Sequence, residues 1–95
     1  MKFLAISTNT GDTRPHLAAE GAQVDDLVRR GVVLSVLVKA DWSGAVLVLD
    51  VADEQAAWAT VQALPIAAHG LTQFTLTHVL DPSDLAPTEA APDQA

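Results

Sequence analysis

The segment 32–51 constrains the fold of this chain most, because it predicts two strands that are apolar on both faces. An antiparallel sheet usually keeps one face in contact with water, and side chains alternate between the faces along each strand. In a chain of 95 residues, the remaining sequence is sufficient to cover one face only. We therefore expect the second face of the sheet to contact another copy of the protein. One face is expected to carry Leu34, Val36 and Val38 and the other Val33 and Leu37; beyond the turn at 41–44, Val46 and Val48 oppose Ala45, Leu47, Leu49 and Val51.

Composition excludes several kinds of site before any motif is considered. The chain contains no cysteine, which excludes disulfides, thiolate metal ligands and a nucleophilic thiol. After Met1 and Lys2, the apolar stretch is too short for a secretory signal or a membrane span. We therefore expect a cytoplasmic protein without a membrane partner.

The net charge of −7 is concentrated toward the C-terminus. Residues 81–95 carry four acidic side chains and no basic one, which leaves −3 for the first 80 residues. Neither part has the cluster of Lys and Arg that attracts phosphate groups. We therefore expect no nucleic-acid partner and no binding to anionic membranes.

The predicted elements follow the order strand, helix, strand, strand, helix, strand. Pro15, with Thr13 as a capping hydroxyl, suits the start of a helix that ends at Gly31. Asp53 suits the N-cap of a second helix that Pro65 ends. This order is typical of a ferredoxin-like α+β domain (βαββαβ), in which two helices cover one face of a four-stranded antiparallel sheet and the first and third strands lie centrally. The strands are expected at residues 2–7, 33–38, 45–51 and 71–80.

Residues 1–82 are expected to form the folded domain, and residues 83–95, which are rich in proline, alanine and acids, a disordered tail. The bare face of the sheet is expected to pair with a second copy, which gives a dimeric α+β barrel. Within the first helix, Gly21 costs about 1 kcal/mol relative to alanine. It permits either close packing, which we favour, or room for a ligand.

The segment from Leu64 to Leu71, with the sequence LPIAAHGL, and the strand around Phe74 that leads to Leu80-Asp81-Pro82 resemble the closing part of muconolactone isomerase-like proteins. A helix over residues 20–31 that runs directly into a strand, and Leu49-Asp50-Val51 before a helix that ends in Leu-Pro, extend the resemblance to roughly residues 1–82. YCII-related domains and the small antibiotic-biosynthesis monooxygenases share the same architecture.

The resemblance implies a dimeric α+β barrel, often assembled into larger rings, with a pocket between sheet and helices. Muconolactone isomerases move a proton within an unsaturated lactone without a metal or a cofactor, so no cofactor is expected here. The acidic residue that this family carries on its first helix corresponds to Glu20. Where the isomerases have Arg, His and Trp on the second strand, this chain has the aliphatic stretch 33–38, which predicts a largely apolar organic ligand.

Glu20 and the three histidines are the residues expected to carry chemistry. Glu20 lies four residues after His16, so a helix places both on one face, either as a base with its partner or as a solvent-facing pair. His69, in the loop before the last strand, is a candidate acid. His78 shares a strand face with Phe74 and is either a second candidate acid or a core histidine. The spacing of His16 and Glu20 permits a metal, but no second ligand pair accompanies it, so no metal site is expected.

Trp42 and Phe74 offer large flat surfaces to a ligand. Trp42 lies in the turn between the two apolar strands, where it either closes over a ligand or anchors an oligomer contact. Together with His16, these two aromatic residues are the expected substrate-binding groups.

Three functions fit these features. The first is a small cofactor-free, isomerase-like enzyme that shifts a proton in a largely apolar cyclic or unsaturated carbonyl compound, with Glu20 as base and His69 or His78 as acid. The second is a non-catalytic small-molecule-binding or accessory protein on the same barrel. The third is a cofactor-free monooxygenase that acts on an aromatic polyketide, in which the substrate itself activates oxygen.

Overall fold

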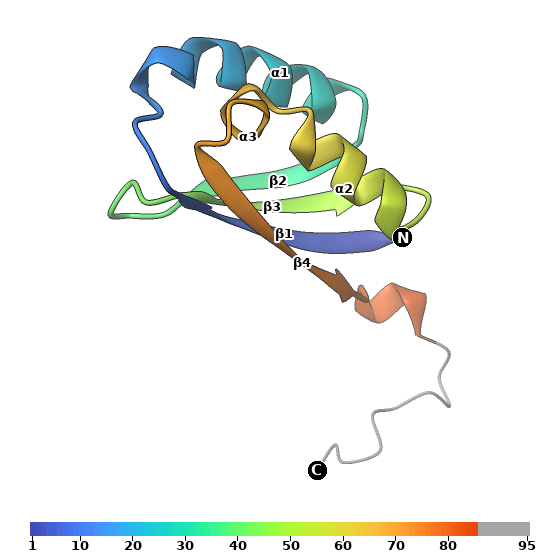
Figure 1. Cartoon of the computed structure of the whole chain (residues 1–95). Coiled ribbons are helices and arrows are strands. Elements are labelled where there is room, and N and C mark those ends of the chain that lie inside the picture. The colour runs from blue at the N-terminus through green and yellow to red at the C-terminus, as the bar shows by residue number, and fades with distance from the viewer. Residues whose placement is uncertain (86–95) are drawn as a thin grey trace.

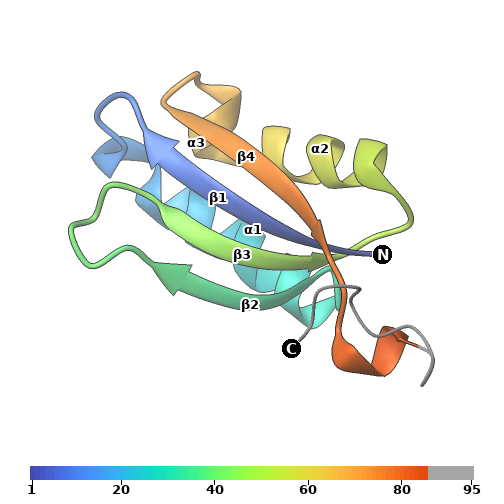
Figure 2. The same cartoon turned by 90° about the horizontal axis from the view of Figure 1, so that it is seen from below.

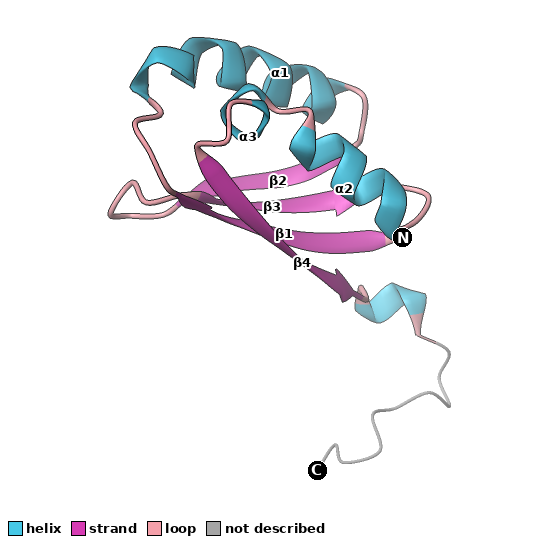
Figure 3. Ribbon diagram, viewed as in Figure 1, coloured by secondary structure: helices cyan, strands magenta, loops and turns pink. Residues whose placement is uncertain are grey.

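A computed structural model describes residues 1–85 of the chain. All of its main helices lie on one side of a single sheet, and the other side of the sheet is bare (Figures 1 and 3). In chain order the elements are β1 (Lys2–Asn9), η1 (Arg14–His16), α1 (Leu17–Arg29), β2 (Val33–Val38), β3 (Ala45–Asp50), α2 (Glu54–Gln62), α3 (Pro65–Ala68), β4 (Thr72–Val79) and η2 (Pro82–Asp84).

The sheet has the strand order β2-β3-β1-β4, and every neighbouring pair is antiparallel (Figure 2). The first and third strands are central, as the sequence predicted. β2 forms one edge of the sheet and β4 the other. The ferredoxin-like α+β fold is therefore confirmed.

A β-bulge in β2 corrects the predicted assignment of its faces. The register shifts between Val33 and Ser35, so Val33 pairs with Leu49 whereas Val36 pairs with Leu47. Leu47 and Leu49 are both buried beneath the helices. Because directly paired residues share a face, Val33 lies on the same face as Val36. The strict alternation that placed these two valines on opposite faces is wrong, since the bulge adds one residue to β2.

The helix-facing side of the sheet holds the core. Phe3, Val33 and Leu49 are almost completely buried there. Ala57 and Val61 of α2 and Leu64 just beyond it pack onto them, since all three are buried within the same cluster. Further members of this cluster are Ala5, Leu27 and Leu47.

Local signals explain where the helices begin and end. The Asp53 carboxylate accepts a hydrogen bond from the Ala56 N–H at 2.8 Å, so the predicted N-cap of α2 is confirmed. Gly31 has a φ of 75° just beyond α1, which is the left-handed conformation that suits glycine. Thr13 precedes η1 but makes no capping hydrogen bond, so that expectation is wrong. Pro65 follows the end of α2 and opens a further short helix, α3, that the sequence did not predict.

The sequence after β4 continues into a short turn before the described part of the chain ends. Asp81 and Asp84 form a reciprocal capping box around η2, and Asp84 lies 3.5 Å from the Lys2 ammonium. The rest of the expected tail, residues 86–95, lies outside the described residues. Within residues 1–85, no helix has the length and apolar character that a membrane span requires.

Candidate active site

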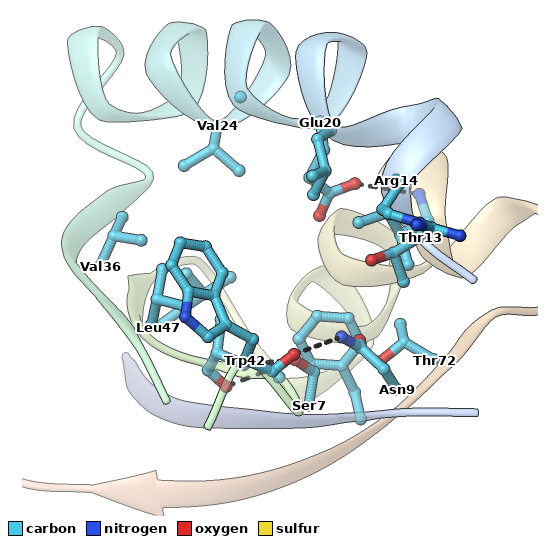
Figure 4. A pocket seen from close by; sticks show the side chains of 17 residues that line it. Ser7, Asn9, Thr13, Arg14, Glu20, Val24, Val36, Trp42, Leu47 and Thr72 are labelled. Atoms are coloured by element: carbon cyan, nitrogen blue, oxygen red, sulfur yellow. Dashed lines mark hydrogen bonds between the residues drawn. The ribbon is translucent and has the colours of Figure 1, made fainter. Parts of the chain in front are cut away.

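A pocket of about 530 Å³ opens between α1 and the helix-facing side of the sheet, at the end where β1 finishes and β4 begins (Figure 4). Side chains from α1, α3 and all four strands contribute to its wall. Leu17, Val38 and Trp42 are 49%, 59% and 76% exposed, so they mark its open mouth. The lining consists of Ser7, Asn9, Thr13, Arg14, Leu17, Glu20, Gly21, Val24, Val36, Val38, Trp42, Gly44, Ala45, Leu47, Ile66, Thr72 and Phe74.

The pocket has an apolar side and a polar side (Figure 4). Val24, Val36, Leu47 and the Trp42 indole gather on the apolar side. The polar side chains stand opposite them, with a single carboxylate above a floor of hydroxyl and amide groups. On that side lie Glu20, Thr13, Arg14, Asn9 and Thr72. Such a pocket suits a ligand with an apolar body and one oxygen-bearing end.

Glu20 is the acidic group at the polar side of this pocket. It comes from the first turn of α1 and is partly buried. One carboxylate oxygen, Oε1, accepts a hydrogen bond from the Ile66 N–H at 2.9 Å, which ties α1 to α3. Burial raises the pKa of the Glu20 carboxyl, and this effect outweighs the lowering by the Ile66 N–H and by the nearby His16. A carboxylate with one oxygen held and a raised pKa is suited to accept a proton from a carbon acid.

His16 and His69 lie together beside this carboxylate, at the junction of α1 and α3. Their rings stack with centroids 4.1 Å apart. His69 Nδ1 lies 2.7 Å from the Pro65 carbonyl oxygen. Because a carbonyl oxygen only accepts hydrogen bonds, Nδ1 must carry a proton, and in the neutral ring Nε2 is the acceptor. Neither ring is part of the pocket lining.

His78 lies at the opposite end of the strand pair. It is paired in register with Phe3, and the two rings pack with centroids 5.2 Å apart. Its neighbours at that end of the sheet include Lys2, Asp50 and Asp84. The structure therefore brings Glu20, His16 and His69 together, and places Trp42 and Phe74 in the pocket wall, but does not bring His78 to the same place.

The floor of the pocket contains polar residues that the sequence reasoning missed. Ser7, Asn9 and Thr72 occupy helix-facing positions of β1 and β4, where Asn9 pairs with Thr72 in register. Ser7 Oγ accepts from the Ala45 N–H at 2.8 Å. Within residues 1–85, Thr72 Oγ1 is a buried hydroxyl without a hydrogen-bond partner. The sequence did contain a signal for these residues. Side chains alternate between the two faces of a strand, so Ser7 and Asn9 fall on the same helix-facing side of β1 as Phe3.

Trp42 reaches the mouth of the pocket from a strained turn. Its φ of 64° is unusual for a residue with a large side chain. Asp41 accepts hydrogen bonds from the Ser43 N–H at 3.0 Å and from the Ser43 hydroxyl at 2.6 Å, and both stabilise this turn. The Asn9 amide donates to the Trp42 carbonyl oxygen at 3.3 Å and so links the turn to β1. Backbone strain of this kind is often found at ligand-binding sites.

The Arg14 guanidinium lines the pocket, and its positive charge is already paired with the Asp12 carboxylate. The Arg14 guanidinium donates two hydrogen bonds of 2.9 Å to the Asp12 carboxylate. These hydrogen bonds lower the pKa of Asp12 to about 2. An anionic ligand would therefore compete with Asp12 for this cation. Within the described chain, His, Asp and Glu side chains form no group of three that could hold a metal ion.

Gly21 lines the pocket on α1, between Leu17 and Val24. A Cβ atom built on it would meet no heavy atom within 4 Å. The expectation that close packing explains this glycine is therefore wrong, since no other element of residues 1–85 approaches that position.

Comparison with known proteins supports the fold. No protein-family model matches the sequence, and no curated protein matches it significantly. Among solved structures, the chain resembles 5-chloro-2-hydroxyhydroquinone dehydrochlorinase (TftG) from Burkholderia phenoliruptrix AC1100, in complex with 2,5-dihydroxybenzoquinone. The TM-score is 0.73 at 15% identity, over 88% of this chain and 98% of that one. At this identity, the likeness shows a shared fold.

Proposed function

We propose that this protein is an enzyme that moves a proton within an apolar cyclic or unsaturated carbonyl compound, with Glu20 as the base. The observation that carries the proposal is the position of the Glu20 carboxylate, partly buried at the polar side of a pocket whose opposite wall is aliphatic and aromatic. Its raised pKa makes the carboxylate a stronger base than an exposed glutamate. The hydrogen bond that the Ile66 N–H donates to the Glu20 carboxylate fixes the orientation of that carboxylate.

In the proposed reaction, the Glu20 carboxylate removes a proton from the carbon next to the carbonyl group. The C–H bond breaks, its electron pair forms an enolate, and Glu20 becomes a neutral carboxylic acid. The same acid then delivers the proton to a different carbon of the conjugated system, and the carboxylate is restored. The developing negative charge on the substrate oxygen needs a hydrogen-bond donor. Asn9 and Thr72 lie on the pocket floor below Glu20, on the same polar side, and are the proposed donors through an amide N–H and a hydroxyl.

The ligand class is supported by the wall and by the structural neighbour. The aliphatic stretch of β2 contributes Val36 and Val38 to the pocket, and the nearby Arg14 is paired with Asp12. Both features favour a neutral ligand. The dehydrochlorinase of similar fold is described in complex with a dihydroxybenzoquinone, which is a ring with carbonyl and hydroxyl groups.

Hydrogen–deuterium exchange tests the proposal without knowledge of the natural substrate. The probe is 2-tetralone, a neutral bicyclic ketone with acidic C–H bonds next to its carbonyl group, dissolved in D₂O with the protein and followed by NMR. We expect the wild-type protein to accelerate loss of the C1 proton signal. Glu20→Gln should abolish the acceleration, because an amide cannot accept the proton. Glu54→Gln, in the exposed first turn of α2, is the matched control and should exchange like the wild type.

Two outcomes contradict the proposal. One is binding of 2-tetralone with no exchange above the protein-free rate, which favours a ligand-binding protein on the same fold. The other is equal acceleration by the wild type and by Glu20→Gln, which removes Glu20 as the base. His69, the expected acid, stacks on His16 beside this carboxylate, but its ring does not line the pocket, so no proton-transfer step is assigned to it. His78 is not assigned a role at this pocket, because it lies at the other end of the sheet.

We also propose that a second copy of this chain covers the bare face of the sheet. Leu37 is 64% exposed on that face, and Leu4, Ile6, Val46 and Val48 lie on the same side. No helix of residues 1–85 covers them (Figure 1). Contiguous exposed apolar surface of this kind is typical of subunit interfaces. Leu37→Asp should weaken self-association in sedimentation velocity at micromolar concentration, whereas Val28→Asp on α1 should not; a monomeric wild type would contradict the pairing.

A further inference from the structure

Gly21 is a glycine that neither the backbone nor the packing of this chain requires. It occupies the interior of α1, where glycine costs about 0.8–1.0 kcal/mol relative to alanine. The glycines with a positive φ are Gly31 and Gly70. A Cβ atom at Gly21 would meet nothing within 4 Å. The chain therefore keeps a destabilising residue at a place where alanine would fit.

The missing side chain enlarges the pocket between two apolar residues. Leu17, Gly21 and Val24 follow one another at helical spacing, and all three line the pocket. A larger residue at the middle position would project into the space toward the sheet. Gly21 thus keeps open the part of the pocket that lies between Leu17 and Val24.

The volume of the pocket exceeds the need of a single ring. A cavity of about 150 Å³ holds one benzene molecule, whereas this pocket measures about 530 Å³. It falls within the range of about 300–1,000 Å³ that is usual for pockets that bind drug-sized ligands. A monocyclic lactone at the Glu20 end would leave the apolar side unfilled.

We infer that Gly21 determines the length of ligand that this pocket accepts, and that the ligand carries a fused bicyclic or larger apolar body behind its carbonyl group. The carbonyl end lies between Glu20 and the pair Asn9 and Thr72, and the body extends toward Val24, Val36 and the Trp42 indole. This inference rests on the proposed function only in taking the pocket as the ligand site, since it concerns binding rather than turnover.

Equilibrium binding tests the inference directly. NMR titration measures the dissociation constants of 2-tetralone, with two fused rings, and of 2-cyclohexen-1-one, with one ring, for wild type and Gly21→Leu. Leucine in the apolar space should raise the dissociation constant of 2-tetralone by about tenfold or more. One methylene too many in a hydrophobic pocket already has an effect of about this size. The single-ring ketone should keep its affinity, because it fits at the polar side alone. Ala22→Leu adds the same side chain at an exposed neighbouring position and should change neither constant.

Gly21→Ala provides a second variant in case leucine disturbs folding. Alanine stabilises the helix, and its methyl group should still weaken 2-tetralone more than the single-ring ketone. Equal weakening of both ketones, or no change in either, would overturn the inference. If 2-tetralone binds with this selectivity but the wild type does not exchange its C1 proton, the proposed proton transfer fails while the role of Gly21 stands.

Discussion

The paired substitutions Gly21→Ala and Gly31→Ala separate two reasons for keeping a glycine. Neither added Cβ would meet a heavy atom within 4 Å, so steric overlap is absent at both positions. Gly21 lies in the helix interior, where alanine should stabilise the protein by about 0.8–1.0 kcal/mol. Gly31 has a φ of 75°, which for a residue with a side chain costs about 1–2 kcal/mol.

The two variants should therefore differ by about 2–3 kcal/mol in the free energy of unfolding, with opposite signs relative to wild type. For a domain of this size, 1 kcal/mol corresponds to about 4–8 °C in Tm. Gly21→Ala should raise Tm by several degrees, and Gly31→Ala should lower it, with the urea m-value unchanged in both. A lower Tm for Gly21→Ala would refute the reasoning, because it would mean that something packs against this position.

Three further predictions concern charge, packing and capping. Because burial raises the folded-state pKa of Glu20, its contribution to stability is complete below the unfolded pKa of about 4.3 and is lost as pH rises through the folded pKa. The stability of Glu20→Gln relative to wild type, from urea unfolding, should therefore be higher at pH 7 than at pH 4, and an unchanged difference would contradict the burial. Gly44→Ala should cost about 2 kcal/mol or more by thermal unfolding, because its Cβ would overlap the Ser7 carbonyl group; a Tm equal to wild type would show that β1 can move away. Asp53→Ala should cost about 1 kcal/mol through loss of the Ala56 hydrogen bond, whereas Asp53→Asn should retain most of it.

The fold was predictable because each element carries a local signal. The helical spacing of the apolar residues Ala57, Val61 and Leu64 indicates which face of α2 is buried, and Asp53 predicted where that helix begins. The element order then determined the sheet, since the crossover rules leave β1 and β3 as the central strands.

Two features were not predictable, and both shape the site. The sequence around Val33 gives no sign of the bulge in β2. Valine and leucine suit either face of this sheet, and no glycine marks the irregularity. The short helix α3 was hidden because Pro65 can both end one helix and begin another. Without α3 there was no reason to expect the Ile66 N–H at Glu20, a contact that joins residues 46 positions apart.

Most candidate residues could be chosen from the sequence, but their grouping could not. Glu20 and His16 were linked by helical spacing, whereas the stack of His16 on His69 depends on how α1 packs against α3. His78 was placed correctly on the face of Phe74, yet position along the strand put it far from the pocket. His78 and Phe74 therefore share a face of the sheet, but only Phe74 belongs to the pocket.

The pH dependence of C1 proton exchange in 2-tetralone tests most directly whether Glu20 acts as a base within this pocket. The protein-dependent rate should rise as Glu20 ionises, with a midpoint above the ordinary pKa of a glutamate, and then reach a plateau, because burial raises the pKa of this carboxyl. The plateau should disappear in Glu20→Gln and persist in Glu54→Gln. A rate that grows with hydroxide concentration without levelling off, in wild type and variant alike, would contradict the assignment.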